Sequence, residues 1–286
     1  MRLDYYLAHA EGMSRKEAKI AVSKGQIEIN GQLVKKANHQ VSESDNVLLQ
    51  GRQLVWQQER YYMLHKPADY VCATQDAEHA IVLDLLPNQL HKDLKIVGRL
   101  DKDTTGLMVV AKTIPAQTHL VEAMQAREIT REYEAVCHGA MTGGGTIDEP
   151  IGRHPTKRTH MAVSQSGKPA TTHFRVMEKY RAHTRLRLRL ETGRTHQIRV
   201  HMSFVNHPLV GDPVYAGRPR PPRKAGEALL GILRNFRRQA LHAAMLRLAH
   251  PVTCEILEWH APIPEDMVQL TTALRADTAE HGLDFV

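Results

Sequence analysis

One stretch of the 286-residue chain decides its fold: G-R-L-D-K-D-T-T-G at residues 98–106, followed at once by L-M-V-V at 107–110. A charged segment between two glycines that leads into an apolar run is typical of a loop entering a buried strand. Such loops commonly hold catalytic groups, because the strand fixes their position. Asp101 has cationic neighbours, Arg99 and Lys102, which favour the ionised form of a carboxyl group. From this loop alone, an aspartate that only shapes the turn is the simpler interpretation.

Around this loop, short strands alternate with helices. The segment 185–190 reads R-L-R-L-R-L, so its leucines should face a core and its arginines the opposite side of a sheet. Three guanidinium groups on one face repel each other unless solvent, carboxylates or phosphates lie between them, and the pattern fits each of these cases. We expect further strands at 61–67, 109–112, 132–137 and 172–177, and helices at 117–126, 229–241 and 264–281.

Residues 1–60 carry the signals of a helix followed by a hairpin. Ser14 and Glu17 form a capping-box signature, and Gly25 is placed to end the helix in a left-handed conformation. Asn30-Gly31 between two short alternating segments is a strong hairpin signal. We therefore expect a helix at 15–24 and strands at 26–29, 32–34 and 46–49.

Positive charge suggests a polyanionic partner. The chain has 38 Lys and Arg residues against 31 Asp and Glu, a net charge of +7. Arg15, Lys16 and Lys19 lie close together on the expected helix, where a solvated face and an anion-binding face are both compatible with the pattern. A polar segment at 50–60 then separates two regions of different composition, which predicts one domain at 1–58 and a second at 59–286.

Several classes of protein are disfavoured. The three cysteines, Cys72, Cys137 and Cys254, are too scattered for a disulfide framework or a structural zinc site. The 18 histidines show no spacing typical of metal ligands, so we expect no metal site. The first ten residues lack the apolar segment of a signal peptide, and no apolar run approaches the roughly 20 residues that span a bilayer. We therefore expect a cytoplasmic protein without membrane association.

Three long motifs carry a resemblance to a known family. The stretch at 98–106 resembles motif I of the RsuA/RluA family of pseudouridine synthases, in which the aspartate is catalytic. T-R-E-Y-E-A-V at 130–136 resembles motif II, and L-E-T-G-R-T-H-Q-I-R-V-H-M at 190–202 resembles motif III of the RluA branch. H-P-L-V-G-D at 207–212 and L-H-A-A-M-L at 241–246 also fit, and residues 2–47 resemble the S4 RNA-binding domain. The motifs follow the family order, so chance occurrence is negligible.

This resemblance implies a fold and a reaction. The fold would be α+β: a small S4 domain followed by a catalytic domain built on a mixed, largely antiparallel sheet with a cleft across its middle. The enzyme would break the N1–C1′ bond of uridine in ribosomal RNA, rotate the uracil and rejoin it through C5. That isomerisation requires no cofactor and no metal. The target base must first be flipped out of its stack, at a cost of a few kcal/mol.

The resemblance also assigns roles to individual residues. Asp101 acts at the sugar, either by attacking C1′ or by stabilising and deprotonating the glycosyl species, and Arg199 pairs with it. Tyr133 stacks on the flipped uracil and is a candidate for the final base. The residues expected to bind the substrate are Arg99, Leu246, Arg194, His196 and Gln197. Those expected to bind RNA phosphates are Arg15, Lys16, Lys19, Arg185, Arg187, Arg189, Arg234 and Arg237.

The two ends of the chain resemble different branches. Residues 1–97 are similar to the RsuA branch, which modifies small-subunit ribosomal RNA, whereas residues from about 102 onward are similar to relatives that modify a stem-loop of large-subunit ribosomal RNA. This seam predicts a hybrid, natural or engineered. Asp69 stands where the RsuA branch usually has glycine in Lys-Pro-x-Gly, a change expected to strain the turn.

The expected partner is ribosomal RNA or a ribosomal precursor particle, and we expect a monomer. Two other functions stay open on the sequence. One is an S4-type RNA-binding factor of ribosome assembly without catalysis. The other is a glycoside hydrolase, which needs two carboxylates about 5 to 10 Å apart across the scissile bond. Asp101 and Asp103 are close in sequence, but nothing in the pattern places them on one substrate.

Overall fold

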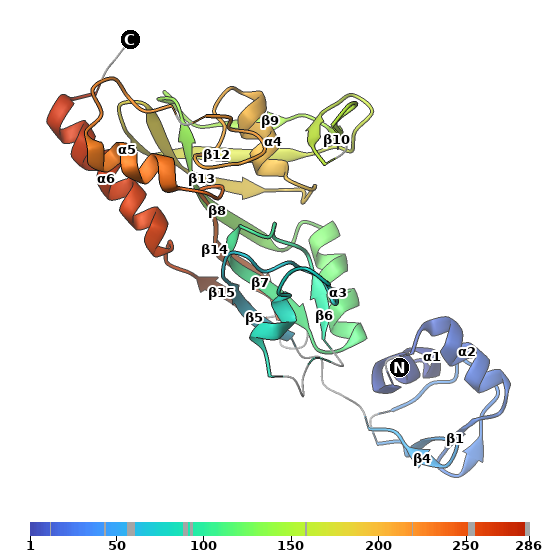
Figure 1. The fold of residues 1–286 in the computed structure, drawn as a ribbon. Helices are drawn as coiled ribbons and strands as arrows, with labels where there is room; N and C mark the ends of the chain where they lie inside the picture. The colour runs from blue at the N-terminus through green and yellow to red at the C-terminus, as the bar shows by residue number, and fades with distance from the viewer. Residues whose placement is uncertain are drawn as a thin grey trace. The chain divides into compact units, whose positions relative to one another are not determined.

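The computed structural model describes residues 1–11, 13–42, 44–55, 61–87, 91, 94–157, 159–218, 220–250 and 255–283. The chain forms two compact units (Figure 1). Unit 1 consists of Met1–Tyr62, Leu86–Val97 and Val109–Glu122, and unit 2 of Met63–Leu85, Gly98–Met108 and Ala123–Val286. The predicted boundary between residues 58 and 59 lies outside the described residues, as does Cys254.

The first 55 residues fold into two helices and a small antiparallel sheet of strand order β2-β1-β3-β4. The elements are α1 (Leu3–Glu11), α2 (Arg15–Ser23), β1 (Ile27–Ile29), β2 (Gln32–Leu33), β3 (Val47–Leu49) and β4 (Arg52–Gln53). The capping box is confirmed: the Glu17 N–H donates to the Ser14 hydroxyl over 3.2 Å, and the Ser14 N–H donates to the Glu17 carboxylate over 2.7 Å. Positive φ angles of 51° and 79° at Asn30 and Gly31 form the expected hairpin turn.

Helix α1 is absent from the sequence predictions, although its pattern carries the signal. Leu3 and Leu7 stand one turn apart and are both fully buried, and Tyr6 and Ala10 are buried beside them. These side chains pack in one cluster with Val22, Ile27 and Val47 of the following elements. The first 55 residues therefore have an apolar core of their own.

Most of the other strands form a large, mostly antiparallel sheet, which draws most of its residues from unit 2 and some from unit 1. Its strand order is β5-β7-β14-β8-β13-β12-β9, with β15 beside β14 and β6 beside the last residues of β7. The strands are β5 (Tyr61–Lys66), β6 (Lys95–Val97), β7 (Thr105–Ala111), β8 (Thr130–His138), β9 (Gly145–Asp148), β12 (Thr171–Lys179), β13 (His183–Leu190), β14 (Leu241–Ala249) and β15 (Ile256–His260). A separate hairpin contains β10 (Ile151–Arg153) and β11 (Met161–Val163). The predicted α+β class is confirmed.

Helices cover this sheet at several places (Figure 1). They are α3 (Ile114–Gln125), α4 (Gln197–Phe204), α5 (Glu227–Asn235) and α6 (Glu265–His281), with a 3-10 turn at Val82–Leu85. Met202 of α4 packs with Leu186 and Leu188 on one face of the sheet. Residues of α5 and α6, including Leu233 and Met267, pack against the other face around Val136.

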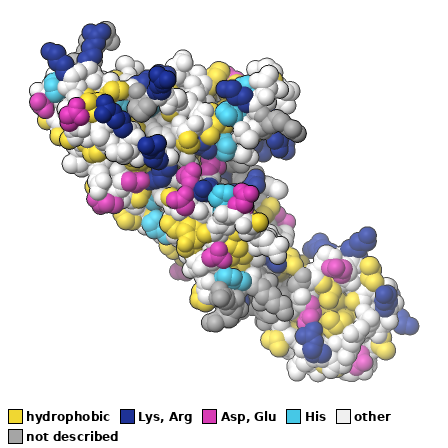
Figure 2. Space-filling model, viewed as in Figure 1, with side chains coloured by type: hydrophobic (Ala, Val, Ile, Leu, Met, Phe, Trp, Pro, Cys, Tyr) yellow, Lys and Arg dark blue, Asp and Glu magenta, His cyan; other side chains and the backbone are white. Residues whose placement is uncertain are grey.

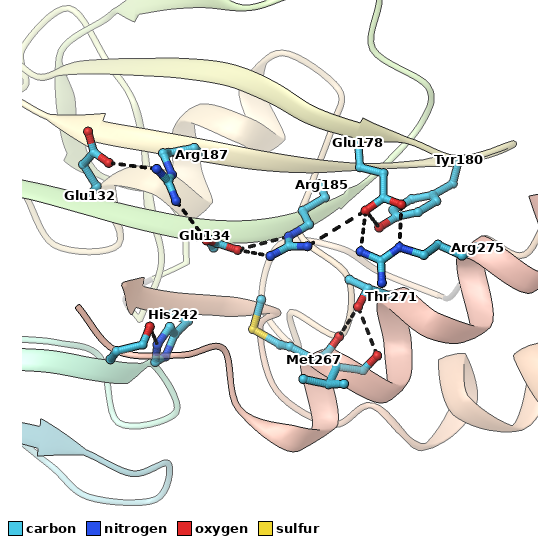
Figure 3. Close-up of polar contacts among 12 residues, drawn as sticks. Glu132, Glu134, Glu178, Tyr180, Arg185, Arg187, His242, Met267, Thr271 and Arg275 are labelled. Carbon is cyan, nitrogen blue, oxygen red and sulfur yellow. Dashed lines mark hydrogen bonds and ion pairs between the residues drawn. The ribbon is translucent and has the colours of Figure 1, made fainter. Parts of the chain in front are cut away.

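Strand β13 confirms the predicted alternation. Leu186, Leu188 and Leu190 are buried in the core, and the three arginines point to the opposite face. Carboxylates lie between the guanidinium groups there (Figure 3). Glu134 of β8 accepts hydrogen bonds from both Arg185, over 3.0 Å, and Arg187, over 3.2 Å. The expected repulsion is therefore relieved by acidic residues of the neighbouring strand.

The predicted helix at 229–241 is wrong in its second half. Helix α5 ends at Asn235, and Phe236 has extended backbone angles with its ring buried. Arg238 lies beyond the helix and pairs with Asp266 at the start of α6 over 2.6 Å. The chain must turn here because Leu241 already begins β14, a strand that was not expected.

The parallel pair β7–β14 places the loop that carries Asp101. Strand β7 begins at Thr105, four residues earlier than predicted, and it pairs with His242 and Ala243 through Thr105 and Gly106. A Cβ atom on Gly106 would stand 2.2 Å from the carbonyl oxygen of Ala243, and the φ angle there is 114°. Only glycine allows the two strands to approach this closely.

Two buried histidines give a prediction for stability. Neither ring nitrogen of His183 has a hydrogen-bond partner among the described residues, and Nδ1 of His138, whose ring centroid is 5.0 Å away, also lacks one. Burial, assisted by the charge of His138 and opposed by Asp277, lowers the pKa of His183 to about 3. Burial and the charge of Arg220 lower the pKa of His138 to about 4. The folded protein therefore keeps both rings neutral at mildly acidic pH.

Between about pH 6.5 and pH 4, unfolded histidines bind protons that the folded state rejects, so stability should fall as pH falls. We expect a loss of up to about 1.4 kcal/mol per pH unit for each ring. His183→Leu should flatten this dependence, measured as the free energy of unfolding in urea at pH 7 and pH 5. The exposed His39 offers a control, His39→Gln. Equal slopes for the parent and His183→Leu would contradict the prediction.

Candidate active site

The loop before β7 is held from several sides, so Asp101 has a fixed position. Within the loop, the Thr104 N–H donates to the carbonyl oxygen of Asp101 over 3.0 Å. The Leu100 N–H donates to Sγ of Cys72 over 3.4 Å. Arg238 donates to the carbonyl oxygen of Asp103 over 3.3 Å, and the side-chain amide of Gln239 donates to the hydroxyl of Thr104 over 2.9 Å.

Lys66 also holds this loop. Its side chain is fully buried, and its Nζ donates to the carbonyl oxygens of Pro67, over 2.9 Å, and Lys102, over 2.6 Å. Burial lowers the pKa of Lys66 to about 8, against the charges of Cys72, Asp103 and Asp101, which raise it. Asp69, at the position where the RsuA branch usually has glycine, has a φ angle of 68°, in the left-handed region that favours glycine.

Arg199 meets Asp101 at the centre of the site. It lies on α4 with 5% of its side chain exposed, and its Nη1 donates to Oδ2 of Asp101 over 2.8 Å. Nε and Nη2 donate to the two oxygens of Asp212 over 2.7 and 2.9 Å. Burial alone would lower the pKa of Arg199, but the charges and hydrogen bonds of Asp212 and Asp101 raise it above its usual value.

Asp212 is fixed by the backbone. Its Oδ1 accepts from the N–H groups of Val214 and Tyr215 over 2.9 and 3.1 Å, and its side chain is fully buried. The Tyr215 ring lies against the Arg199 guanidinium, 5.1 Å from centroid to Cζ. The orientation of Arg199 is therefore set by groups that belong to a rigid turn.

His196 lies on the other side of Asp101. Its Nε2 stands 4.0 Å from Oδ1 of Asp101, and its Nδ1 is 2.8 Å from the hydroxyl of Tyr215. Burial lowers the pKa of His196; Asp101 opposes this effect and Arg199 adds to it. The motifs at 98–106 and 190–202 are thus brought together around one carboxylate.

Tyr133 of β8 is buried in the core cluster beside Leu188 and Ala243, with Leu100 packed against that cluster. Burial raises the pKa of its phenol, Arg131 counteracts this, and the charge of Asp101 raises the pKa further. A contact of Tyr133 with the substrate beside Asp101 stays a prediction.

The other predicted substrate contacts differ in their surroundings. The Gln197 amide donates to Thr171 and Thr172 and accepts from Thr192 and the Arg194 N–H, so it anchors α4 to the sheet. Arg99 is exposed, Arg194 is half-buried with its Nε donating to the carbonyl oxygen of Pro169 over 3.0 Å, and Leu246 is buried on β14 opposite Arg131. Substrate binding by these residues stays a prediction.

The predicted RNA-binding residues fall into two groups. Leu188 and Tyr133 are cross-strand partners in the core, so Arg185, Arg187 and Arg189 point to the sheet face opposite Tyr133. Arg185 and Arg187 are engaged there by Glu132, Glu134 and Glu178. The more accessible cations are Arg15, Lys16, Lys19, Arg189, Arg234 and Arg237. Lys and Arg side chains project from both units (Figure 2).

Sequence reasoning missed three groups of this site. Asp212 ends the H-P-L-V-G-D segment, which the resemblance matches without assigning it a role, and Tyr215 follows it. Lys66 is the lysine of the Lys-Pro-x-Gly comparison and has no assigned role either. Among the described residues, no group of three or more His, Cys, Asp or Glu side chains is arranged to hold a metal ion. In the same part of the chain, no helix has the length and apolar character needed to cross a membrane.

Known proteins resemble the whole chain. A family model described as RNA pseudouridylate synthase matches residues 60–204, and an S4 domain model matches residues 1–47. Ribosomal large subunit pseudouridine synthase D of Escherichia coli O157:H7 is 52% identical over 98% of this chain and 92% of its own length. The same-named enzyme of Escherichia coli K12 is 73% identical over 65% of this chain and 57% of its own length.

Solved structures agree with these matches. The structure of human RNA pseudouridylate synthase domain containing 4 gives a TM-score of 0.60 at 26% identity, covering 77% of this chain and 91% of the human chain.

The chain belongs to the RNA pseudouridylate synthase family. It is an isomerase that converts uridine to pseudouridine in RNA, and the alternative of a non-catalytic S4-type binding factor is disfavoured. Identity differs between the long and the short alignment, so similarity is uneven along the chain; the hybrid origin stays a prediction.

A substitution at Asp212 tests whether its carboxylate orients Arg199. Asp212→Asn keeps the shape of the side chain but leaves the buried guanidinium without its second anion. We expect a loss of roughly 3–5 kcal/mol in the free energy of unfolding and a decrease of about a hundredfold in the single-turnover rate, because a misplaced Arg199 misplaces Asp101. The measurements are urea unfolding and the rate of pseudouridine formation.

Glu258→Gln is the matched control, because Glu258 also pairs with an arginine, Arg247, but both side chains are largely exposed. It should change stability by less than about 1 kcal/mol. If Asp212→Asn behaved like this control, the role given to the Asp212 carboxylate would be incorrect.

Proposed function

We propose that Asp101 is the catalytic carboxylate and that Arg199 orients it for reaction at C1′ of the target uridine. One observation carries this proposal: the 2.8 Å hydrogen bond from Nη1 of Arg199 to Oδ2 of Asp101 joins two residues that are 98 positions apart in the sequence. Arg199 holds Oδ2, so Oδ1 is the oxygen that faces the ribose. The loop contacts described above limit the motion of the carboxylate before the substrate arrives.

The reaction balances without any further reagent. In one route, Asp101 forms a bond to C1′ while the N1–C1′ bond breaks and its electron pair goes to the uracil. In the other, Asp101 stabilises and deprotonates the glycosyl species. In both routes the uracil rotates and C5 bonds to C1′. As this bond forms, the bond between Asp101 and C1′ breaks in the first route, and Asp101 returns the proton that it removed in the second. A base then removes the C5 proton and N1 gains a proton, so the product is an isomer of the substrate. Both routes place the same carboxylate oxygen next to C1′.

Tyr133 is proposed as the residue that stacks on the flipped uracil. Its position in the core beside Leu188 supports a packing role. Burial raises the pKa of its phenol, so the phenol stays protonated at neutral pH and is a poor base. Of the two roles that the resemblance assigns to Tyr133, the surroundings favour stacking.

We propose ribosomal RNA of the large subunit, free or within a precursor particle, as the substrate. The support is the relative of 52% identity, whose name states that it is a ribosomal large subunit pseudouridine synthase, together with the S4 match at residues 1–47. Separate family matches on either side of residues 48–59 also support the division into domains at 1–58 and 59–286. We further propose that the enzyme acts in the cytoplasm as a monomer.

The assignment of Asp101 is tested by Asp101→Asn. Transcripts of both ribosomal RNAs and a ribosomal precursor particle are incubated with the protein, and pseudouridine is mapped by chemical sequencing. The parent enzyme should modify large-subunit RNA. Asp101→Asn should bind RNA but form no detectable product, because the amide cannot perform either step of the carboxylate.

Asp103→Asn is the matched control, since it makes the same change two residues away in the same loop and should retain most of the activity. Product with Asp101→Asn would remove Asp101 from the chemistry. Product of the parent only on small-subunit RNA would overturn the substrate assignment, and product on neither RNA would overturn the ribosomal assignment altogether.

The S4 region is tested through its salt dependence. Arg15, Lys16 and Lys19 lie exposed on α2, and we propose that they bind RNA phosphates. Replacing all three by alanine should weaken RNA binding and reduce the slope of log K against log[salt] by about 2 to 3. The exposed Arg247, which is paired with Glu258, serves as a control through Arg247→Ala. An unchanged slope in the triple variant would exclude this surface from the RNA contact.

A further inference from the structure

His196 has an unusual backbone conformation beside the catalytic loop. It occupies the N-cap position of α4 with φ 56° and ψ 22°, in the left-handed region, and its side chain makes no capping hydrogen bond. A residue with a Cβ atom is held in this region only when surrounding contacts compensate for the strain, and such strain clusters at functional sites. Capping of α4 therefore does not explain the conformation of His196.

A chain of hydrogen bonds favours one tautomer of His196. The Met161 N–H donates to the hydroxyl oxygen of Tyr215 over 3.0 Å, and that hydroxyl is 2.8 Å from Nδ1 of His196. While the tyrosine oxygen accepts from Met161, its own proton is available for donation to Nδ1. A neutral His196 then carries its proton on Nε2.

The charged and titratable groups around His196 favour this neutral form. Burial lowers the pKa of the imidazole, and Arg199 and His160 lower it further, whereas Asp101 and Asp212 raise it; the net direction is downward. At neutral pH the ring thus presents an uncharged Nε2–H donor. That donor faces Oδ1 of Asp101.

The separation between these two atoms fits an intervening hydroxyl group. Nε2 and Oδ1 of Asp101 are 4.0 Å apart, which is too far for a direct hydrogen bond. An oxygen atom at about 2.8 Å from each can accept from Nε2–H and donate to Oδ1. When Oδ1 faces C1′ of the target nucleotide, the ribose hydroxyl next to that carbon is the 2′-hydroxyl.

We propose that Nε2–H of His196 and Oδ1 of Asp101 together bind the 2′-hydroxyl of the target uridine, and that this contact makes the site selective for a ribonucleotide over a deoxyribonucleotide. The proposal rests on the proposed position of Asp101 at C1′. The 2′-hydroxyl is the group by which a protein distinguishes RNA from DNA at a given nucleotide. His196 is thereby a substrate-binding residue, and Tyr215 is a positioning residue that acts through it.

The test uses a synthetic RNA containing the mapped target uridine, with either a 2′-hydroxyl or a 2′-deoxy group at that single nucleotide. The parent enzyme should convert the ribonucleotide faster by about tenfold to a hundredfold, because the deoxy substrate leaves Nε2–H of His196 and Oδ1 of Asp101 without the hydroxyl group between them. His196→Asn should lose this preference: asparagine tolerates the left-handed backbone, but its amide ends where Nδ1 stands. His196→Gln, whose amide reaches the position of Nε2, should restore part of it.

Tyr215→Phe removes the hydroxyl that holds the ring in one tautomer, so it should reduce the preference without abolishing conversion. His260→Asn, at an exposed histidine of β15, should leave the preference unchanged. An unchanged preference in His196→Asn, or equal rates of the parent enzyme on both RNAs, would overturn the inference while leaving the proposed function intact. Failure of the parent enzyme to convert any RNA would overturn both.

Discussion

A buried guanidinium group must be matched by anions that are themselves held in place, and in this protein that requirement organises the site. Arg199 uses one edge of its plane for Asp212 and a remaining N–H for Asp101. Asp212 accepts two backbone N–H groups of its own turn, so it cannot follow the arginine if the arginine moves. The orientation of Asp101 therefore follows from a turn more than one hundred residues further along the chain.

The large sheet positions Asp101, the other member of this ion pair. Gly106 lets β7 lie against β14, which fixes the point at which the loop that carries Asp101 leaves the sheet. Lys66, Cys72 and Arg238 then bind backbone groups of the loop. These contacts involve main-chain atoms of the loop, so they fix its path while leaving the side chain of Asp101 to Arg199. A buried lysine is costly, and its two carbonyl partners are what make its burial tolerable.

Local patterns predicted local structure well. The capping box at Ser14, the Asn30-Gly31 turn and the alternation in β13 depend on neighbours in sequence, and all three are confirmed. Helix α4 was not expected, because it begins after a histidine in the left-handed conformation and has no side-chain cap. Its residue Arg199 points into the site and not to solvent. The pairing of Asp101 with Arg199 came from the family resemblance alone: residues 98 positions apart meet through sheet topology, which periodicity does not reveal. The prediction that α5 extends to Leu241 was wrong for the same reason. Arg238 pairs with Asp266 of α6, a contact between distant residues that local patterns do not reveal.

Arginine content alone overstates the surface available to RNA. On the sheet face opposite Tyr133, Arg185 and Arg187 alternate with Glu132, Glu134 and Glu178, and Arg275 of α6 continues this series of ion pairs (Figure 3). A cation bound by a carboxylate releases fewer counterions from RNA than an exposed one, so these arginines contribute little to phosphate binding. Their position on that face follows from the alternation of side chains along β13, and acidic residues of β8 and β12 pair with them there.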